Sequence, residues 1–198
     1  MKPGRGTAPT LIGRALVLEP LGEAHRRPLQ MAAQDSRIWA YMSHAGETTD
    51  GFEAWFEAAQ TGVAAGSAVV YAVRRRSDTR LVGSSRFMNI ADEHRRREIG
   101  NTWYVPSAWG TRVNPECKLL LLQHAFEVLD LLRVEFRCDA RNERSRQALA
   151  RLGSVEEGVL RRHMIVRDGF VRDTVQFSVL REEWPAVRAG LEARLAQA

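Results

Sequence analysis

Four stretches of the chain have the pattern of strands: the first alternates hydrophobic and polar residues, and the second and third are rich in residues that favour strands. They are residues 14–21, 68–74, 81–90 and 97–105. The second and third are joined by a polar connection of hairpin type at residues 75–79. We therefore predict an opening strand followed by an antiparallel meander of three strands.

Other segments repeat hydrophobic residues with the period of a helix. A short helix is predicted at residues 25–33, and a longer one at about residues 51–61 with Asp50 as its N-cap. Residues 182–197 form a closing helix. These helices would flank the predicted sheet.

Two strand-helix units follow the meander. After the strand at 97–105 and a turn with Arg112, Asn114 is a suitable N-cap and Pro115 suits the first position of a helix. The core stripe predicted for this helix is Leu119, Leu122, Phe126 and Leu129. In the second unit, a strand at 133–139 leads to a helix that opens at Asn142 and ends at Gly153. Two helices that begin after parallel-type strands bring unpaired N–H groups and positive dipole ends together, which favours a phosphorylated ligand.

A last hairpin is predicted from residues 159–166 and 170–180, around the turn Arg167-Asp168-Gly169. With it, the elements predict an α/β (α+β) fold with a mixed central sheet of about seven strands flanked by helices. A chain of 198 residues with 44% hydrophobic content can bury one good-sized core. We expect a single domain over residues 1–198, with residues 1–10 as a flexible arm.

Composition narrows the class of protein. The longest apolar run, Leu119 to Leu122, is too short to cross a membrane, and the N-terminus lacks the apolar segment of a signal peptide, so we expect a soluble, cytoplasmic protein. Cys117 and Cys138 have no metal-ligand spacing and are expected to be reduced packing residues. The net charge of +5 comes largely from arginine and favours phosphate-bearing or acidic partners.

Two motifs resemble those of the GNAT N-acetyltransferases. The loop Trp109-Gly110-Thr111-Arg112-Val113-Asn114 falls where that family has the pyrophosphate-binding pattern Arg/Gln-x-x-Gly-x-Gly/Ala, although Trp109, Arg112 and Asn114 depart from it. Asn142-x-x-Ser145, followed by Leu152-Gly153, resembles the signature of the RimJ/RimL branch, which modifies the N-termini of ribosomal proteins. The similarity covers about residues 14–180.

The resemblance implies an acetyl-CoA site and no metal. The residues that it places at the cofactor are Val105, Gly110, Thr111, Arg112, Val113, Asn114, Asn142 and Ser145. Asn142 would bind the pantetheine arm, and Ser145 would lie near the sulfur and protonate the departing thiolate. A local alternative makes Asn142 an N-cap with Ser145 as its partner. Glu116 would repel a phosphate and is therefore expected to point to solvent.

Amide formation from a thioester needs a neutral amine, a group that removes its proton and stabilisation of the oxyanion. Alternation along residues 98–105 puts Glu98, Gly100, Thr102 and Tyr104 on one face of the strand, and Ile99, Asn101, Trp103 and Val105 on the other. Glu98 is a candidate general base, since GNAT enzymes often use a glutamate here.

The same residues allow other roles. Glu98 could instead pair with one of the arginines at 95–97, and His163 is a second candidate base because its pKa is naturally near neutrality. Tyr104 could protonate the sulfur or simply pack.

An acceptor pocket would come from the first half of the chain. Its candidate aromatic walls are Trp39, Tyr41, His44, Trp55 and Phe87, most of which could equally be core residues. Asp173 could bind an ammonium group or pair with Arg172.

Three function classes remain open at this point. The residues favour an N-acetyltransferase that passes the acetyl group of acetyl-CoA directly to a primary amine, on a protein N-terminus or a small molecule, in a protein that could be a homodimer like related enzymes. A catalytically inactive acyl-CoA-binding module is the alternative, because the glycine loop is incomplete. A nucleic-acid-binding domain rests only on the arginine excess, without a nucleic-acid motif.

Overall fold

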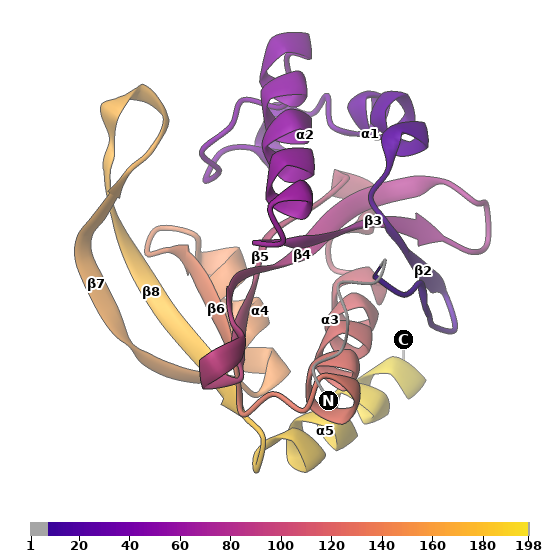
Figure 1. Ribbon diagram of the computed structural model, residues 1–198, viewed down its shortest axis with the longest axis vertical. Helices are drawn as coiled ribbons and strands as arrows, with labels where there is room; N and C mark the ends of the chain where they lie inside the picture. The colour runs from indigo at the N-terminus through magenta and orange to yellow at the C-terminus, as the bar shows by residue number, and fades with distance from the viewer. Residues whose placement is uncertain (1–7, 198) are drawn as a thin grey trace.

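A mixed sheet of eight strands with helices on both faces forms the framework of the protein (Figure 1). The computed structural model describes residues 8–197. The strands are β1 (Leu11–Ile12), β2 (Leu16–Pro20), β3 (Val69–Arg75), β4 (Leu81–Ala91), β5 (Arg96–Tyr104), β6 (Arg133–Asp139), β7 (Val155–Ile165) and β8 (Val171–Leu180). The helices are α1 (Arg26–Ala32), α2 (Thr49–Ala64), α3 (Val113–Gln123), α4 (Glu143–Leu152) and α5 (Trp184–Ala196), with a π-helical segment, His124–Val128, continuing α3. Single 3₁₀ turns lie at Glu23–His25, Ser36–Ile38, Asp92–His94, Pro106–Ala108 and Arg167–Gly169.

The predicted mixed sheet flanked by helices is confirmed, with eight strands in place of about seven. The added strand is β1, whose Leu11 and Ile12 pair with Leu18 and Val17. Two residues cannot display an alternating pattern, so this strand leaves no periodic signal in the sequence. The predicted arm at residues 1–10 lies outside the described residues except for 8–10.

The strand order is β1-β2-β3-β4-β5-β6-β8-β7. All neighbours are antiparallel except β5 and β6, which pair in parallel over three residue pairs, from Arg96↔Arg133 to Glu98↔Glu135. The meander predicted between residues 68 and 105 is therefore present as β3, β4 and β5. The parallel connection runs through α3, as the strand-helix units predict.

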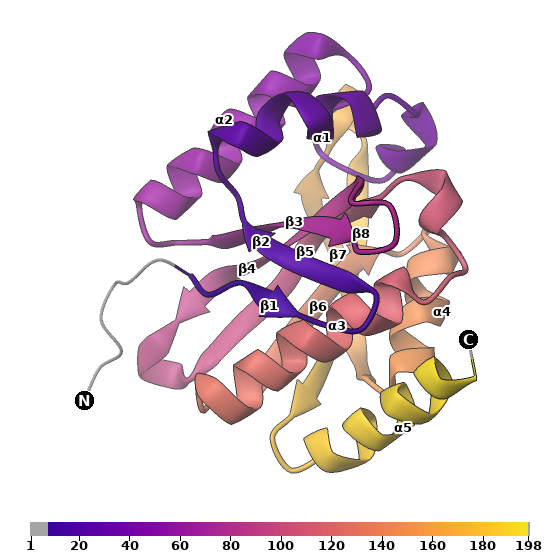
Figure 2. The ribbon, with the colours of Figure 1, turned by 90° about the vertical axis from the view of Figure 1, so that its right-hand side faces the viewer.

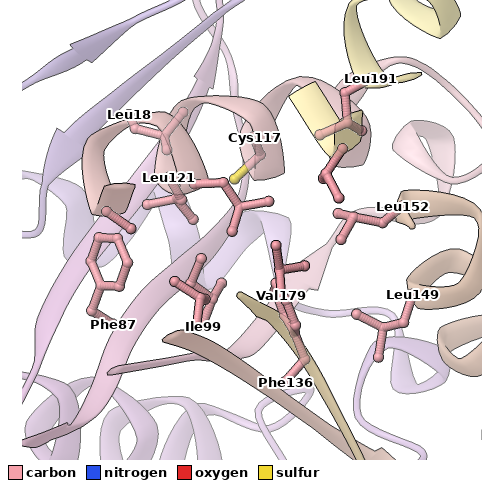
Figure 3. Packing of buried hydrophobic residues seen from close by; sticks show 14 of the residues in the cluster. Leu18, Phe87, Ile99, Cys117, Leu121, Phe136, Leu149, Leu152, Val179 and Leu191 are labelled. Atoms are coloured by element: carbon pink, nitrogen blue, oxygen red, sulfur yellow. The ribbon is translucent and has the colours of Figure 1, made fainter. Parts of the chain in front are cut away.

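The sheet divides the core into two clusters, and helices cover the cluster on each face (Figure 2). On one face, α1 and α2 cover the half of the sheet formed by β2 to β5, around Trp39, Phe52, Trp55 and Trp103. On the other face, α3, α4 and α5 pack against the strands with Leu121, Phe136, Leu152, Val179 and Leu191 among the contacts (Figure 3). Both cysteines are buried and free in this second cluster, as predicted.

Two details of the helices differ from the predictions. The N-cap of α2 is Thr48, whose Oγ1 accepts the Gly51 N–H at 3.1 Å, and not Asp50. Thr48 has the extended backbone of an N-cap and lies one residue before the first helical position.

The buried face of α3 is also wider than the predicted stripe. Leu122 and Phe126 are buried, but Leu119 and Leu129 are only partly covered, while Cys117 and Leu121 are fully buried. The reason is that α3 packs against α5 as well as against the sheet, where it contacts β1 and β2. No helix in residues 8–197 is long and apolar enough to cross a membrane.

Candidate active site

A cavity of about 610 Å³ lies where β5 and β6 separate. Parallel pairing ends at Glu98↔Glu135. Beyond that pair, residues 99–104 of β5 and 136–139 of β6 line the cavity together. The starts of α3 and α4 border it as well, so the structure brings the two predicted helix starts to one place.

The turn before α3 is held by Thr111. Its Oγ1 donates to the Ala108 carbonyl at 2.7 Å and accepts the Val113 N–H at 3.3 Å. The helix begins at Val113, so the prediction of Asn114 as N-cap and Pro115 as first helical residue is wrong by two positions. Asn114 nevertheless lines the cavity with Gly110 and Thr111. Gly110 has a φ of +72°, a conformation that glycine adopts without strain.

Three of the residues that the resemblance placed at the cofactor do not line the cavity. Arg112 donates from Nη2 to the Leu195 carbonyl at 3.2 Å and lies with its Nε 3.5 Å from Glu116 Oε2. Val113 is in the core, and Val105 packs against it. In the turn that leads into α3, the side chains of Arg112 and Val113 are directed toward α5 and the core, whereas Gly110, Thr111 and Asn114 face the cavity.

Glu116 does not point to solvent, and that prediction is wrong. Its side chain is 3% exposed, and Oε1 accepts the N–H groups of Ala15 at 2.7 Å and Leu16 at 3.2 Å. The β1–β2 turn lies beside the first turn of α3, and a Cβ at Gly13 would come within 2.4 Å of Glu116 Oε1. The carboxylate therefore satisfies two backbone donors that have no ladder partner there.

At the start of α4, Asn142 is the N-cap: its Oδ1 accepts the Ser145 N–H at 3.0 Å. This is the local arrangement that the sequence allowed as an alternative. Both residues also line the cavity, and the Asn142 Nδ2 group makes no hydrogen bond to any residue in 8–197. Capping the helix therefore leaves the amide N–H₂ available for a ligand. The helix ends at Gly153, whose φ is +93°, as predicted.

Glu98 is buried, with 5% of its surface exposed, and lines the cavity. Asn89 Nδ2 donates to Glu98 Oε2 at 2.7 Å, and Arg137 Nε lies 3.5 Å from the same oxygen. Burial raises the pKa of Glu98, an effect opposed by the Arg137 guanidinium and the Asn89 bond. A carboxylate with a raised pKa in a cavity has the character expected of a general base.

The arginines at 95–97 are not the partners of Glu98. Arg95 binds Asp130, Arg96 lies 3.4 Å from Glu135, and Arg97 donates to Asp92 at 3.0 Å. The pairing suggested by sequence proximity is therefore wrong, because the partner of Glu98 comes from the neighbouring strand β6.

A bulge at Asn101 changes the faces of β5. Asn101 has a φ of +47°, and the register with β4 shifts between Ser84 and Arg86. Thr102 consequently faces α3, while Trp103 packs in the cluster under α2 and Ile99 in the cluster under α3. The predicted alternation is wrong beyond Gly100, since a bulge adds one residue to one strand and exchanges the faces that follow.

Other candidates take varied positions. His163 lines the cavity, with Nδ1 3.2 Å from Thr174 Oγ1, and its pKa is lowered by burial and by Arg137 and Arg172. Tyr104 also borders the cavity, but its hydroxyl is buried without a hydrogen-bond partner among the described residues. Burial raises the pKa of Tyr104 well above 10.0.

Most of the predicted aromatic walls are core residues. Trp39, Trp55 and Phe87 are fully buried, and of the five candidates only Tyr41 lines the cavity among the described residues.

Asp173 does not pair with Arg172. Its Oδ1 accepts the Arg162 N–H at 2.6 Å, whereas Arg172 Nε donates to Thr174 Oγ1 at 3.0 Å.

Several cationic residues at the cavity had no role in the sequence reasoning. Arg144 lies 3.6 Å from the centre of the Trp109 ring and so bridges the two helix starts. Arg151 and Arg194 line the cavity too, and Lys118 reaches it from α3. Arg144 could have been predicted from its position inside the Asn142-x-x-Ser145 motif. The other three could not, because the sequence does not say which face of each helix is turned toward the cavity.

Comparisons with known proteins point to one family of enzymes. Residues 15–155 match the model of an acetyltransferase (GNAT) domain. The chain is similar to the uncharacterized N-acetyltransferase YoaA of Bacillus subtilis, 31% identical over 111 residues, which are 56% of this chain and 62% of YoaA. It is also similar to the putative ribosomal N-acetyltransferase YdaF of the same organism, 34% identical over 107 residues, or 54% of this chain and 57% of YdaF.

The matched segments thus cover less than two thirds of either relative. Among solved structures, a putative acetyltransferase from T. thermophilus superposes with a TM-score of 0.86 at 38% identity, covering 96% of this chain and 98% of that one.

Proposed function

The chain belongs to the acetyltransferase (GNAT) family and is an acyltransferase, and we propose that it transfers the acetyl group of acetyl-CoA directly to a primary amine. The observation that carries the proposal is the cavity between the separating strands β5 and β6, with two helix starts at one part of it and the buried Glu98 at another. A cofactor with phosphates at one end and a thioester at the other matches such a site.

The residues present fit CoA. Helix starts offer backbone N–H groups to phosphates, and Asn114 and Thr111 lie beside the start of α3. Arg144, Arg151 and Arg194 add positive charge along the same cavity. We assign the pantetheine contact to Asn142, because its Nδ2 is free of protein partners in the described chain. Acetyl-CoA would supply the activated acetyl group as a thioester.

In the proposed reaction, Glu98 takes the proton of the attacking amine, directly or through a water molecule. Ser145, at the start of α4, also lines the cavity and would donate a proton to the departing sulfur. Transfer in a ternary complex needs no covalent protein intermediate. The positions of Glu98 on β5 and Ser145 on α4 place the base and the acid on different elements around one cavity.

For the acceptor, we propose a protein N-terminal amine or a small-molecule amine. The name of YdaF, a putative ribosomal N-acetyltransferase, supports the first. Tyr41 and His163 border the cavity and would contact the acceptor.

The test combines binding and turnover. Calorimetric titration with acetyl-CoA should show binding that Arg144→Ala weakens by about tenfold, the loss of roughly one charge-assisted contact. Arg146→Ala is the matched control, because Arg146 is on the same helix, pairs with Glu143 and Glu156, and does not line the cavity. No binding by the unmodified protein would overturn the proposal.

Release of CoA should then be followed with peptides that carry free or blocked N-termini and with small amines. Glu98→Gln should lower kcat by about 100-fold or more if Glu98 is the base, whereas Glu135→Gln, on the neighbouring strand and outside the cavity lining, should change it little. Binding of acetyl-CoA without turnover on any amine would favour the inactive acyl-CoA-binding module instead.

A further inference from the structure

Lys118 is a buried cation in the wall of the cavity, and the reaction proposed above gives it no role. It lies on α3, one helical turn after Asn114, and its side chain is 5% exposed. The ammonium group sits between the two strands that separate: its Nζ is 3.1 Å from Thr102 Oγ1 on β5 and 5.5 Å from the centre of the Phe136 ring on β6.

The charge of Lys118 is poorly compensated by the protein. The hydrogen bond to the neutral Thr102 hydroxyl uses one of three N–H donors, and no carboxylate in residues 8–197 forms an ion pair with it. Burial lowers the pKa of Lys118 to about 8, opposed by Cys117 and Glu98. Burying an ammonium group without an anionic partner is costly, so two free donors in a cavity wall indicate an acceptor that arrives with the ligand.

The choice of lysine is unusual for this chain. Lysine and arginine together number 29, and the lysines are Lys2 and Lys118 alone. Arginine presents five donors in a rigid fork, whereas lysine presents a compact charge on a flexible stem. A narrow site between Thr102 and Phe136 suits the compact group, and a single carbonyl oxygen is an acceptor of matching size.

We infer that Lys118 binds a carbonyl oxygen in the pantetheine or acyl part of the acyl-CoA, an inference that rests on the proposed function. The ammonium group lies beyond the start of α3, between Asn114 and the last parallel residue pair of β5 and β6, Glu98↔Glu135. The arm of CoA carries two amide carbonyls and ends in the thioester carbonyl. Lys118 would therefore hold the arm from the α3 side, opposite Asn142 on α4.

The other titratable groups around Lys118 ionise at different pH. Cys117 and Tyr104 have pKa values raised by burial from 9.0 and from 10.0, and Glu98 is a carboxylic acid. The remaining ionisation of a CoA phosphate lies near pH 6. A change in acetyl-CoA binding between pH 7 and 9 that disappears in Lys118→Met would therefore report Lys118.

The direct test is NMR of protein labelled with ¹³C at the lysine ε-carbon, titrated from pH 6.5 to 10 with and without saturating acetyl-CoA. The chain has two lysine signals, and Lys2→Gln, at a position outside the described residues, identifies that of Lys118 without touching the core. A charge-assisted hydrogen bond should raise the pKa of Lys118 by about one to two units on binding. Simple packing gives the opposite sign, because a ligand that only removes water lowers the pKa of a lysine.

Calorimetry provides the second measurement. Acetyl-CoA should bind the unmodified protein about tenfold more weakly at pH 9.5 than at pH 7, and Lys118→Met should weaken binding at pH 7 and remove that difference. If acetyl-CoA binds and the pKa of Lys118 stays constant or falls, the inference is overturned and the proposed function stands. If acetyl-CoA does not bind, both fail.

Discussion

Replacing Glu116 by alanine should destabilise the protein by about 3 kcal/mol, although the residue belongs neither to the hydrophobic core nor to the cavity lining. Its carboxylate is 3% exposed and accepts the N–H groups of Ala15 and Leu16 at 2.7 and 3.2 Å. Removing the acceptor leaves two donors without partners, at about 1–3 kcal/mol each where water cannot reach them. Loss of a negative charge in the first turn of α3 adds about 0.3–1 kcal/mol.

The value of about 3 kcal/mol lies in the lower part of the range given by these contributions together. Ala15 is only partly buried, so water can reach its N–H group once the Glu116 side chain is truncated. Glu116→Gln keeps one acceptor oxygen but loses the charge, and it should cost roughly half as much. Glu143→Ala is the matched control: it removes a glutamate from the first turn of α4, but this side chain is 69% exposed. Its cost should stay within about 1 kcal/mol, the value of an exposed charge at a helix start.

Urea unfolding followed by circular dichroism gives the comparison, with the free energy of unfolding extrapolated to water and the slope checked for each variant. Equal slopes are required for the difference in midpoint to measure stability. A Glu116→Ala variant no less stable than Glu143→Ala would refute the view that this carboxylate ties the β1–β2 turn to α3.

Three further results are expected. The pH profile of kcat/KM should have an acid limb above the ordinary carboxylic acid range, because burial raises the pKa of Glu98 and only the deprotonated form accepts a proton; a limb at or below pH 4.5 would exclude Glu98 as the base. Asn101→Val should cost about 2 kcal/mol of stability in thermal unfolding and Asn101→Gly about 1 kcal/mol, since both lose the 2.9 Å bond from Trp55 Nε1 but glycine tolerates the positive φ; equal costs would contradict the role of the bulge. Arg74 lowers the pKa of Glu19 from 4.5 to about 2, so the unfolded chain binds more protons between these values and stability should fall as pH drops through that window; Glu19→Gln should flatten the fall, and an unchanged acid titration would count against this ion pair.

Much of the framework could be predicted because it depends on local pattern. β6 spans residues 133–139, as predicted. α4 begins after Asn142 and ends at Gly153 because a side-chain cap and a left-handed glycine are local signals. The bulge at Asn101 has no such signal, since it is defined only by the register against β4.

The residues of the candidate site also separate into those that the sequence pattern predicts and those that it does not. Strand and helix order predicts that Glu98, Asn142 and Ser145 lie near one another, and all three line one cavity. Lys118 was missed because its place at the cavity depends on how α3 is rotated about its own axis, whereas Arg144 lies inside the Asn142-x-x-Ser145 motif and could have been considered from the sequence. Arg112 is the opposite case. Its position in a motif predicts a cofactor contact, but its guanidinium donates to the Leu195 carbonyl of α5.

The three parallel residue pairs between β5 and β6 have a consequence for how the chain folds. Strands β1 to β5 join neighbours in the sequence through antiparallel pairs, and β6 to β8 form a second antiparallel group. The two groups meet along a short seam that forms only after the α3 crossover has closed, the kind of non-local contact that slows folding. A ligand that occupies the widening seam touches both groups at once, and hydrogen exchange at β5 and β6 would then slow together, as expected for two folding units linked into one.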